Sequence, residues 1–431
     1  MPSRAEVKVF ARYWAQWNAT TINDYWYRAG YTDWDLLCNY LKGIDDRNRL
    51  GERLLSPAQP PNGLGWYNLT DVTVRRRQAQ LAKEYGVHGF AIDHYWCARK
   101  VSWGKPRSWG ESDYGADMDE TVSQLLEDGE PNIPFYFVWV NEDFVWKWKA
   151  WGTATAGNLS RLAKLRKNDT QVPIKFPRAS WRPHFNYLLR FFKHTNYHRI
   201  AGWPVLGMHS LKSLPPDEMW DVFQLWAREA ALPGIYILQT THGLPSRYVN
   251  HKPMYTTTHG RRRMAPWAHG VNEFGWLANF GNRRTVPPSN AHPHWTHGII
   301  VDVDNTARMF KGSALIGKKS SAAGGPDNFG RGFELILNDT LKRMARGRQS
   351  EAMITIVSWN EWSEQAALEP SDRYGVGYLE ALRRVLEKYG QLRFNGERGL
   401  WQKPMQTPME QLTSCKSGVE STRPRGWPEY K

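Results

Sequence analysis

The chain has 431 residues, a formal net charge of +15, and ordinary shares of 41% hydrophobic and 23% charged residues. This length fits one large domain, and the lack of a run of eighteen apolar residues argues against a membrane-spanning helix. The basic charge suits a polyanionic partner, such as nucleic acid, anionic lipid or an acidic glycan, but composition does not choose among them.

Aromatic residues are unusually frequent, with 23 Trp and 19 Tyr. Flat aromatic faces suit sugar rings, whose C–H faces are apolar, while Trp residues also pack beneath long loops. For any single Trp, packing explains its presence as well as sugar binding does.

The cysteines and sequons bear on the compartment. Three cysteines without C-x-x-C spacing indicate neither a disulfide framework nor a cysteine zinc site, which fits a reducing environment. Five N-x-S/T sequons would be acceptors only in a secretory lumen, and the first residues lack the pattern of a signal peptide. We expect a cytoplasmic protein, with a secretory route as the alternative if the N-terminus is incomplete.

Helix–strand units repeat along the chain. A first strand is expected at residues 7–14, and the clearest unit begins at Asp71, a helix N-cap, and ends in a strand at residues 88–96. One face of its helix is marked by Val74, Gln78, Leu81 and Tyr85. Further strands are expected within residues 132–143, 202–210, 235–238, 296–305 and 351–362.

The strands are nearly continuous apolar runs, typical of parallel strands buried on both faces. Seven of them, with an eighth expected between residues 241 and 296, predict a (β/α)8 barrel. A doubly wound open sheet is the alternative, but it predicts a Gly-rich phosphate turn, and no G-x-G-x-x-G opens a helix. Long βα loops are expected near residues 99–115, 145–180 and 241–296. Residues 1–400 would form the barrel domain and residues 401–431 an irregular tail.

In barrels of this kind the chemistry lies where strands end and their helices begin. The residues at these positions are polar and aromatic, so we predict a substrate-binding set there. Its members are Tyr13, Trp14, Gln16, Asp93, His94, Tyr95, Trp96, Trp139, Asn141, Glu142, Asp304, Asn305, Arg308, Trp359, Asn360 and Trp362, with Trp34 and Trp148 from neighbouring loops.

The stretch WNEWSE presents Glu361 and Glu364 three residues apart, between indoles and directly after a strand. Cleavage of a glycosidic bond needs one carboxyl group that protonates the departing oxygen and a second that stays ionised as base or nucleophile. Close like charges and an apolar wall separate two such titrations. We therefore predict Glu361 and Glu364 as the catalytic pair. Structural roles, as helix caps or ion-pair partners, are expected instead for Asp302, Glu369 and Asp372.

Five segments in order resemble the motifs of the WbsX-type family, which carries a glycosyltransferase label and is related to the endo-α-mannosidases of glycoside hydrolase family 99. They stand at residues 23–34, 64–96, 139–148, 303–308 and 358–381. The resemblance spans residues 7–390 and implies a (β/α)8 barrel that acts on glycans, often bacterial surface polysaccharides, without a metal. It further implies that Glu361 is a base acting on the sugar 2-hydroxyl, giving a 1,2-anhydro intermediate, and that Glu364 is the general acid.

The chain departs from the family pattern at three places. Residues 15–18 read AQWN where relatives commonly have Pro-Gln-Phe-His, Ser363 replaces the histidine of the mannosidases, and Asp93 stands where an aromatic residue is common. These departures predict altered subsites, so specificity for mannose does not follow from the resemblance.

These observations predict a retaining, endo-acting glycosidase for an oligosaccharide or polysaccharide, neutral or anionic, without cofactor and as a monomer. A glycosyltransferase of surface-polysaccharide synthesis is one alternative, although neither a P-loop nor a dinucleotide fingerprint appears. Its D-x-D would be Asp302–Asp304, which could ligate Mg²⁺ from one strand face.

A non-catalytic glycan-binding protein is the other alternative. Nucleic acid is disfavoured because paired carboxylates in a groove repel phosphate. Histidines between His242 and His297 lack zinc-site spacing and are expected in loops, and Arg75–Arg77 is expected on a solvated helix face.

Overall fold

The structure is a computed structural model of the whole chain. It describes residues 6–20, 23, 29–41, 53–98, 114–141, 144–145, 171–172, 176–210, 214–241, 245–249, 252–257, 260–263, 267–274, 276–277, 294–304, 307, 325–347 and 352–392. The predicted tail at residues 401–431 lies outside these residues, so its division from the barrel stays a prediction.

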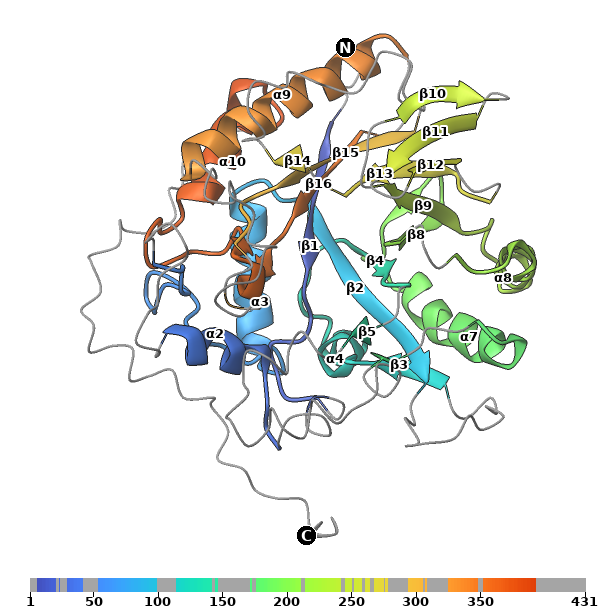
Figure 1. Cartoon of the computed structure of the whole chain (residues 1–431), viewed down its shortest axis with the longest axis horizontal. Coiled ribbons are helices and arrows are strands. Elements are labelled where there is room, and N and C mark those ends of the chain that lie inside the picture. The colour runs from blue at the N-terminus through green and yellow to red at the C-terminus, as the bar shows by residue number, and fades with distance from the viewer. Residues whose placement is uncertain are drawn as a thin grey trace.

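Eight parallel strands form a closed barrel in the described part of the chain (Figure 1). In order around the barrel they are β1 (Lys8–Tyr13), β2 (Gly89–Ala98), β4 (Phe135–Trp139), β8 (Trp203–Met208), β9 (Tyr236–Thr241), β13 (Gly270–Glu273), β15 (Trp295–Ile300) and β16 (Met353–Val357). Because β1 pairs with both β2 and β16, the sheet has no open edge at that point. This confirms the predicted barrel, including its eighth strand, β13.

Helices surround the strands (Figure 1). They are α2 (Asp33–Leu41), α3 (Val72–Glu84), α4 (Glu120–Asp128), α7 (Trp181–Phe192), α8 (Asp217–Glu229), α9 (Gly325–Ala345) and α10 (Gly377–Lys388). The predicted start of α3 is confirmed, because Asp71 accepts a hydrogen bond from the backbone N–H of Thr73 at 2.8 Å. Its predicted inner face is confirmed too, since Gln78 and Leu81 are fully buried.

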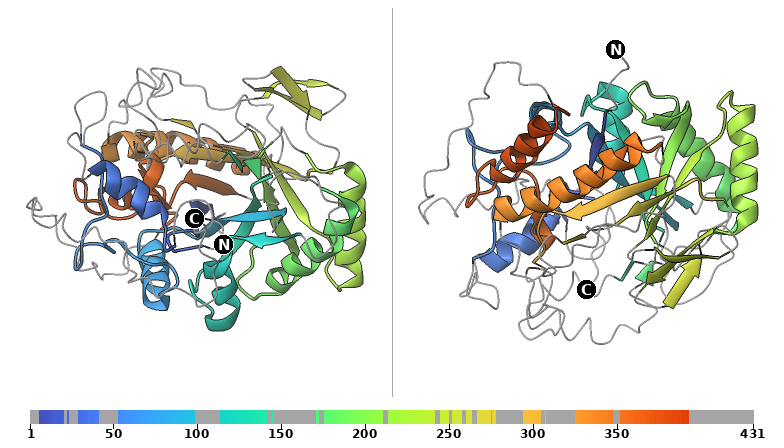
Figure 2. Two further views of the ribbon diagram at one scale, coloured as in Figure 1. Left: turned by 60° about the horizontal axis from the view of Figure 1, so that its bottom comes forward. Right: turned by 90° about the horizontal axis from the view of Figure 1, so that it is seen from above.

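Short strands decorate the barrel. These are β3 (Tyr114–Asp117), β5 (Phe144–Val145), β6 (Gln171–Val172), β7 (Arg199–Ile200), β10 (Pro245–Val249), β11 (Lys252–Thr257), β12 (Gly260–Arg263), β14 (Trp276–Leu277), β17 (Asn360–Glu361) and β18 (Ala366–Ala367), with 3-10 helices η3 (Arg178–Ser180) and η6 (Trp362–Glu364). The sheet of β10, β11 and β12 lies at the periphery (Figure 2). It occupies part of the expected loop between β9 and β13, where the described residues contain no helix.

Along each strand, successive side chains alternate between the barrel interior and the helical layer. Inside, the ring of Phe10 lies 5.0 Å from that of Tyr136 and 4.7 Å from that of His198. Outside, Phe137 packs edge-on against Phe191 of α7 with ring centroids 4.8 Å apart. Both faces are therefore buried, which explains why the strands are apolar throughout.

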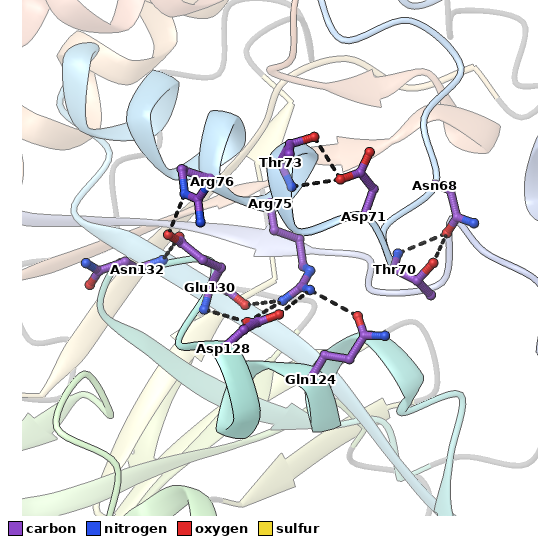
Figure 3. Close-up of polar contacts among 10 residues, drawn as sticks. All are labelled: Asn68, Thr70, Asp71, Thr73, Arg75, Arg76, Gln124, Asp128, Glu130 and Asn132. Atoms are coloured by element: carbon purple, nitrogen blue, oxygen red, sulfur yellow. Dashed lines mark hydrogen bonds and ion pairs between the residues drawn. The ribbon is translucent and has the colours of Figure 1, made fainter.

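Arg75 corrects the expectation of a solvated arginine run on α3. Its side chain is 1% exposed and pairs through two nitrogens with Asp128 of α4, at 2.9 and 2.7 Å (Figure 3). Gln124 and the carbonyl oxygen of Glu130 accept its remaining hydrogen bonds. Arg76, in contrast, is half exposed. Arg75 thus links α3 to α4, because a guanidinium can satisfy several acceptors at once.

Cys38 on α2 is disulfide-bonded. The spacing of the three cysteines did not indicate such a bond, because disulfides depend on proximity in space, which sequence separation does not report. The interpretation of the cysteines as unpaired is therefore wrong for Cys38.

Candidate active site

The two predicted catalytic glutamates lie on one tight turn after the last barrel strand. Glu361 ends β17, which pairs with β18, and Glu364 ends η6 between these two strands. Both side chains are partly exposed. Ser363 donates a 2.7 Å hydrogen bond to Oε1 of Glu361, and the backbone N–H of Glu361 donates to Ser358. The turn therefore brings the two acids to the same end of the barrel and orients one of them.

Buried aromatic and amide groups hold this turn from below. The amide of Asn360 accepts from the backbone N–H of Trp14 at 2.8 Å and donates to its carbonyl at 3.0 Å. The indole of Trp17 donates to the carbonyl oxygen of Asn360 at 2.8 Å. Trp359, Asn360 and Trp362 are fully buried. Asn360 and the backbone N–H of Trp359, which donates to the carbonyl oxygen of Arg12, thus anchor the turn to the end of β1.

A charged cluster lies at the carboxyl ends of β1, β2 and β8. Arg12 forms an ion pair with Asp93, and its other terminal nitrogen lies 3.4 Å from Nδ1 of His209. Burial raises the pKa of Asp93; Arg12 and His209 oppose this, and the charge of Glu364 adds to it. Glu364 is therefore near enough for its charge to act on the Asp93 carboxyl group. Asp93 was predicted, whereas Arg12 and His209 were missed.

A signal for Arg12 is visible in the sequence, because a cation within a buried apolar strand needs a partner. Its guanidinium also lies over the ring of Phe274, 5.8 Å from the centroid, and this ring meets that of His209 edge-on. No sequence pattern marks His209 or Phe274.

Three predicted substrate residues face the helices instead of the barrel mouth. The Nε2 atoms of His94 and His184 on α7 lie 2.9 Å apart, and Trp96 stacks on His184 with centroids 4.5 Å apart. Trp139 meets the same imidazole edge-on at 4.5 Å. Burial lowers the pKa of His94 to about 3. Since neighbouring residues of a strand point to opposite faces, an inward Asp93 requires an outward His94. His94 therefore packs against α7, and its predicted substrate contact stays a prediction.

The aromatic residues around β1 also make internal contacts. Tyr13 donates to Gln78 of α3 at 2.7 Å, and the indole of Trp14 donates to Asp33 at 2.9 Å. Tyr95 meets Trp14 edge-on, and Trp34 stacks on Trp17 with centroids 3.8 Å apart. Gln16 is buried as well. Of this group, Trp14 bonds directly to the turn that carries the glutamates, through Asn360.

The remaining predicted residues divide in two. Asn141 is fully buried and exchanges two hydrogen bonds with the backbone of Ser210, which joins the ends of β4 and β8. The backbone N–H of Asp304 donates to the carbonyl oxygen of Glu364 at 2.7 Å. Four predicted residues, Glu142, Trp148, Asn305 and Arg308, lie outside the described residues.

The acids assigned structural roles are held by neutral donors. Asp302 accepts from Tyr378, Asp372 from Ser56, and Glu369 from three buried side chains.

His297 lies in β15, not in a loop, and bonds to Asp339 of α9. Among the described residues no group of three or more His, Cys, Asp or Glu is placed to hold a metal ion. None of the described helices is long and apolar enough to cross a membrane.

A closed (β/α)8 barrel whose ionisable groups gather at the carboxyl ends of its strands is the architecture of barrel enzymes. The chain belongs to the glycosyltransferase WbsX family, whose model matches residues 9–382. This confirms the resemblance to that family.

The chain is also similar to two curated proteins and to solved structures. It is 24% identical over 403 residues to WxcX from two strains of Xanthomonas campestris pv. campestris, a protein described as uncharacterized. These matches cover 90% of this chain and 51% of WxcX, so the chain spans about half the length of the curated relatives it matches.

Two solved structures match with a TM-score of 0.48 and 14% identity. A glycoside hydrolase-like protein matches over 89% of this chain and 95% of that chain. The GH99 endo-alpha-mannosidase from Bacteroides thetaiotaomicron matches over 90% of this chain and 98% of that chain.

Proposed function

We propose that the chain cleaves or transfers a glycosidic bond, with Glu361 and Glu364 as its catalytic carboxyl groups. The observation that carries this proposal is their common placement on the turn after β16, where both side chains are partly exposed. The charge of Glu364 also acts on Asp93. Acids that serve only as caps or ion-pair partners have no need to share one short turn at a barrel mouth. Membership in a family named for glycosyl transfer supports the same reaction class.

The proposed mechanism retains the anomeric configuration. Glu361 takes the proton of the sugar 2-hydroxyl, whose oxygen attacks the anomeric carbon, while Glu364 gives its proton to the departing oxygen. Water then opens the resulting 1,2-anhydro sugar: Glu364 accepts the proton of water, and Glu361 returns its proton to the 2-oxygen. Two displacements at one carbon restore its configuration. The bond from Ser363 holds the Glu361 carboxylate in one orientation for these transfers.

Asp93 is the predicted substrate residue that we keep in the proposed site. It lies within β2, beside Val138 of β4, and its carboxyl group pairs with Arg12 and is affected by the charge of Glu364. A carboxylate held by Arg12 can accept a hydrogen bond from a sugar hydroxyl without moving. We propose that the Arg12–Asp93 pair forms the floor on which the reacting sugar rests.

The test begins with a screen of α-mannan, rhamnan, arabinan and anionic glycans for released reducing ends. On a substrate with a poor leaving group, Glu364→Gln and Glu361→Gln should each lower kcat by roughly 10²–10⁴-fold. Glu229→Gln, at an exposed site on α8, is the matched control and should keep full activity. Near-normal activity of Glu364→Gln would refute its role as acid, and an inverted first product in proton NMR would refute the mechanism.

The name of the family favours a glycosyltransferase as the second candidate function. A transferase needs an activated donor, so incubation with sugar nucleotides and Mg²⁺ should then release a nucleoside diphosphate in the presence of an acceptor glycan. Release that depends on Glu361 or Glu364, without hydrolysis of any glycan, would decide for transfer. Binding of glycans with neither activity would indicate a non-catalytic protein.

A further inference from the structure

Glu369 is a buried acid with three neutral hydrogen-bond donors, just after the turn that carries Glu361 and Glu364. Its Oε2 atom accepts from the indole of Trp362 and from the hydroxyl of Tyr67, both at 2.8 Å. Its Oε1 atom accepts from Nε2 of Gln78 at 2.7 Å. The side chains of Gln78 and Trp362 are fully buried, and Glu369 is 2% exposed.

These donors come from three separate parts of the fold. Trp362 belongs to η6, Gln78 to α3, and Tyr67 to the segment before α3. Because Trp362 lies between Glu361 and Glu364 in the chain, a bond to its indole restrains the backbone that carries both. Tyr67 also receives a 3.3 Å hydrogen bond from Asn360, the residue before Glu361.

We propose that Glu369 is a positioning residue, which fixes the orientation of Glu361 and Glu364 by binding the indole between them to helix α3. This rests on the proposed function, since it assumes that those two glutamates do the chemistry. A buried acid is costly unless its oxygens are fully engaged, so a plain structural contact would be made more cheaply by an apolar side chain. A carboxyl group is the side chain that can accept from an indole, a phenol and an amide together.

Two tyrosines, Tyr13 and Tyr67, are titratable groups whose pKa is affected by Glu369. Tyr13 and Tyr67 face it, and burial raises the pKa of both well above the ordinary value, so both stay neutral near pH 7. Arg75 acts on Tyr13 from α3. Burial raises the pKa of Glu369 itself to about 7, against its hydrogen bonds. A change of its charge near neutral pH should therefore be visible at Trp362.

Glu369→Gln is the central variant, because it keeps the shape of the side chain but replaces one accepting oxygen with an N–H₂ group. An N–H₂ group cannot accept, so in either orientation of the new amide at least one of the donors Trp362, Tyr67 and Gln78 loses its acceptor. We expect kcat to fall by about 10²-fold with KM within about threefold, since small misplacements of reacting groups reduce turnover by this much. Tyr67→Phe, which removes one donor and little volume, should lower kcat by less.

The readout independent of substrate is the indole N–H resonance of Trp362, assigned by its loss in Trp362→Phe. In the unaltered protein it should shift with a midpoint near pH 7, and the shift should be absent in Glu369→Gln. Asp128→Ala is the control for general destabilisation, because Asp128 lies on α4 and contacts no residue of the turn. It should keep its kcat below its unfolding temperature.

Each outcome decides the matter. Normal kcat in folded Glu369→Gln, or an indole resonance that does not respond to pH in the unaltered protein, would overturn the positioning role. Equal losses of kcat in Glu369→Gln and Asp128→Ala would do the same, because they would reflect stability alone. If Glu364→Gln stayed active, the proposed function would fail, and the indole resonance alone would then decide whether Glu369 holds the turn.

Discussion

Removal of Asp128 tests how much the link between α3 and α4 contributes to stability. The guanidinium of Arg75 is 1% exposed and gives Asp128 two of its hydrogen bonds, with Gln124 and the backbone of Glu130 as its other acceptors (Figure 3). In Asp128→Ala this charge stays buried with only the neutral acceptors left. The variant should therefore lose stability through an uncompensated buried cation.

The magnitude follows from the exposures of the two partners. Removing one member of a fully buried ion pair costs about 3–5 kcal/mol. Because Asp128 is 31% exposed and Arg75 keeps two acceptors, we expect a loss of about 2–3 kcal/mol. The adjacent Arg76 pairs with Glu130 while 52% exposed, so Arg76→Ala should cost less than about 1 kcal/mol.

Urea unfolding at pH 7 measures both variants, with the slope m unchanged. The pKa of Asp128 is lowered, because hydrogen bonds from Arg75 and the backbone outweigh burial. The stability that Asp128 contributes is therefore fully present above pH 3.8, the ordinary value of its pKa, and is lost as pH falls through the lowered pKa. The difference in the free energy of unfolding between the unaltered protein and Asp128→Ala should therefore become smaller at acid pH. Equal losses for Asp128→Ala and Arg76→Ala would refute the reasoning.

Three further predictions concern buried rings. Trp17→Ala should lower stability by about 3–5 kcal/mol in urea unfolding, because this indole is fully buried, and a small loss with weaker glycan binding would instead place it at the substrate. Burial opposes protonation of His297, but the hydrogen bonds that its imidazole donates to Asp339 and Glu273 raise its pKa. The stability that His297 contributes should be fully present below pH 6.5 and lost as pH rises through its raised pKa. A constant difference in the free energy of unfolding between the unaltered protein and His297→Gln from pH 6 to 9 would contradict this prediction. His94, with its pKa lowered to about 3, should make the protein less stable as pH falls from 6.5, and His94→Leu should flatten this slope.

Much of the fold was predictable because it depends on local pattern. Apolar runs of strand length, separated by helices with capping residues such as Asp71, predict parallel strands and therefore the barrel. The missed elements include β10, β11 and β12, whose strands lack a continuous apolar run. The position of the two glutamates after the last strand was also legible, because it needs only the end of β16.

The sequence by itself determined the order of strands and helices, the family, and the presence of Glu361 and Glu364 at the end of β16. Only the tertiary structure decided that Arg12 pairs with Asp93 inside the barrel while His94 packs against α7. In a parallel barrel both faces of each strand are buried, so hydrophobicity along the strand does not distinguish the interior from the helical layer. Closure of the sheet sets which residues point inward, and it brings together side chains that lie hundreds of residues apart.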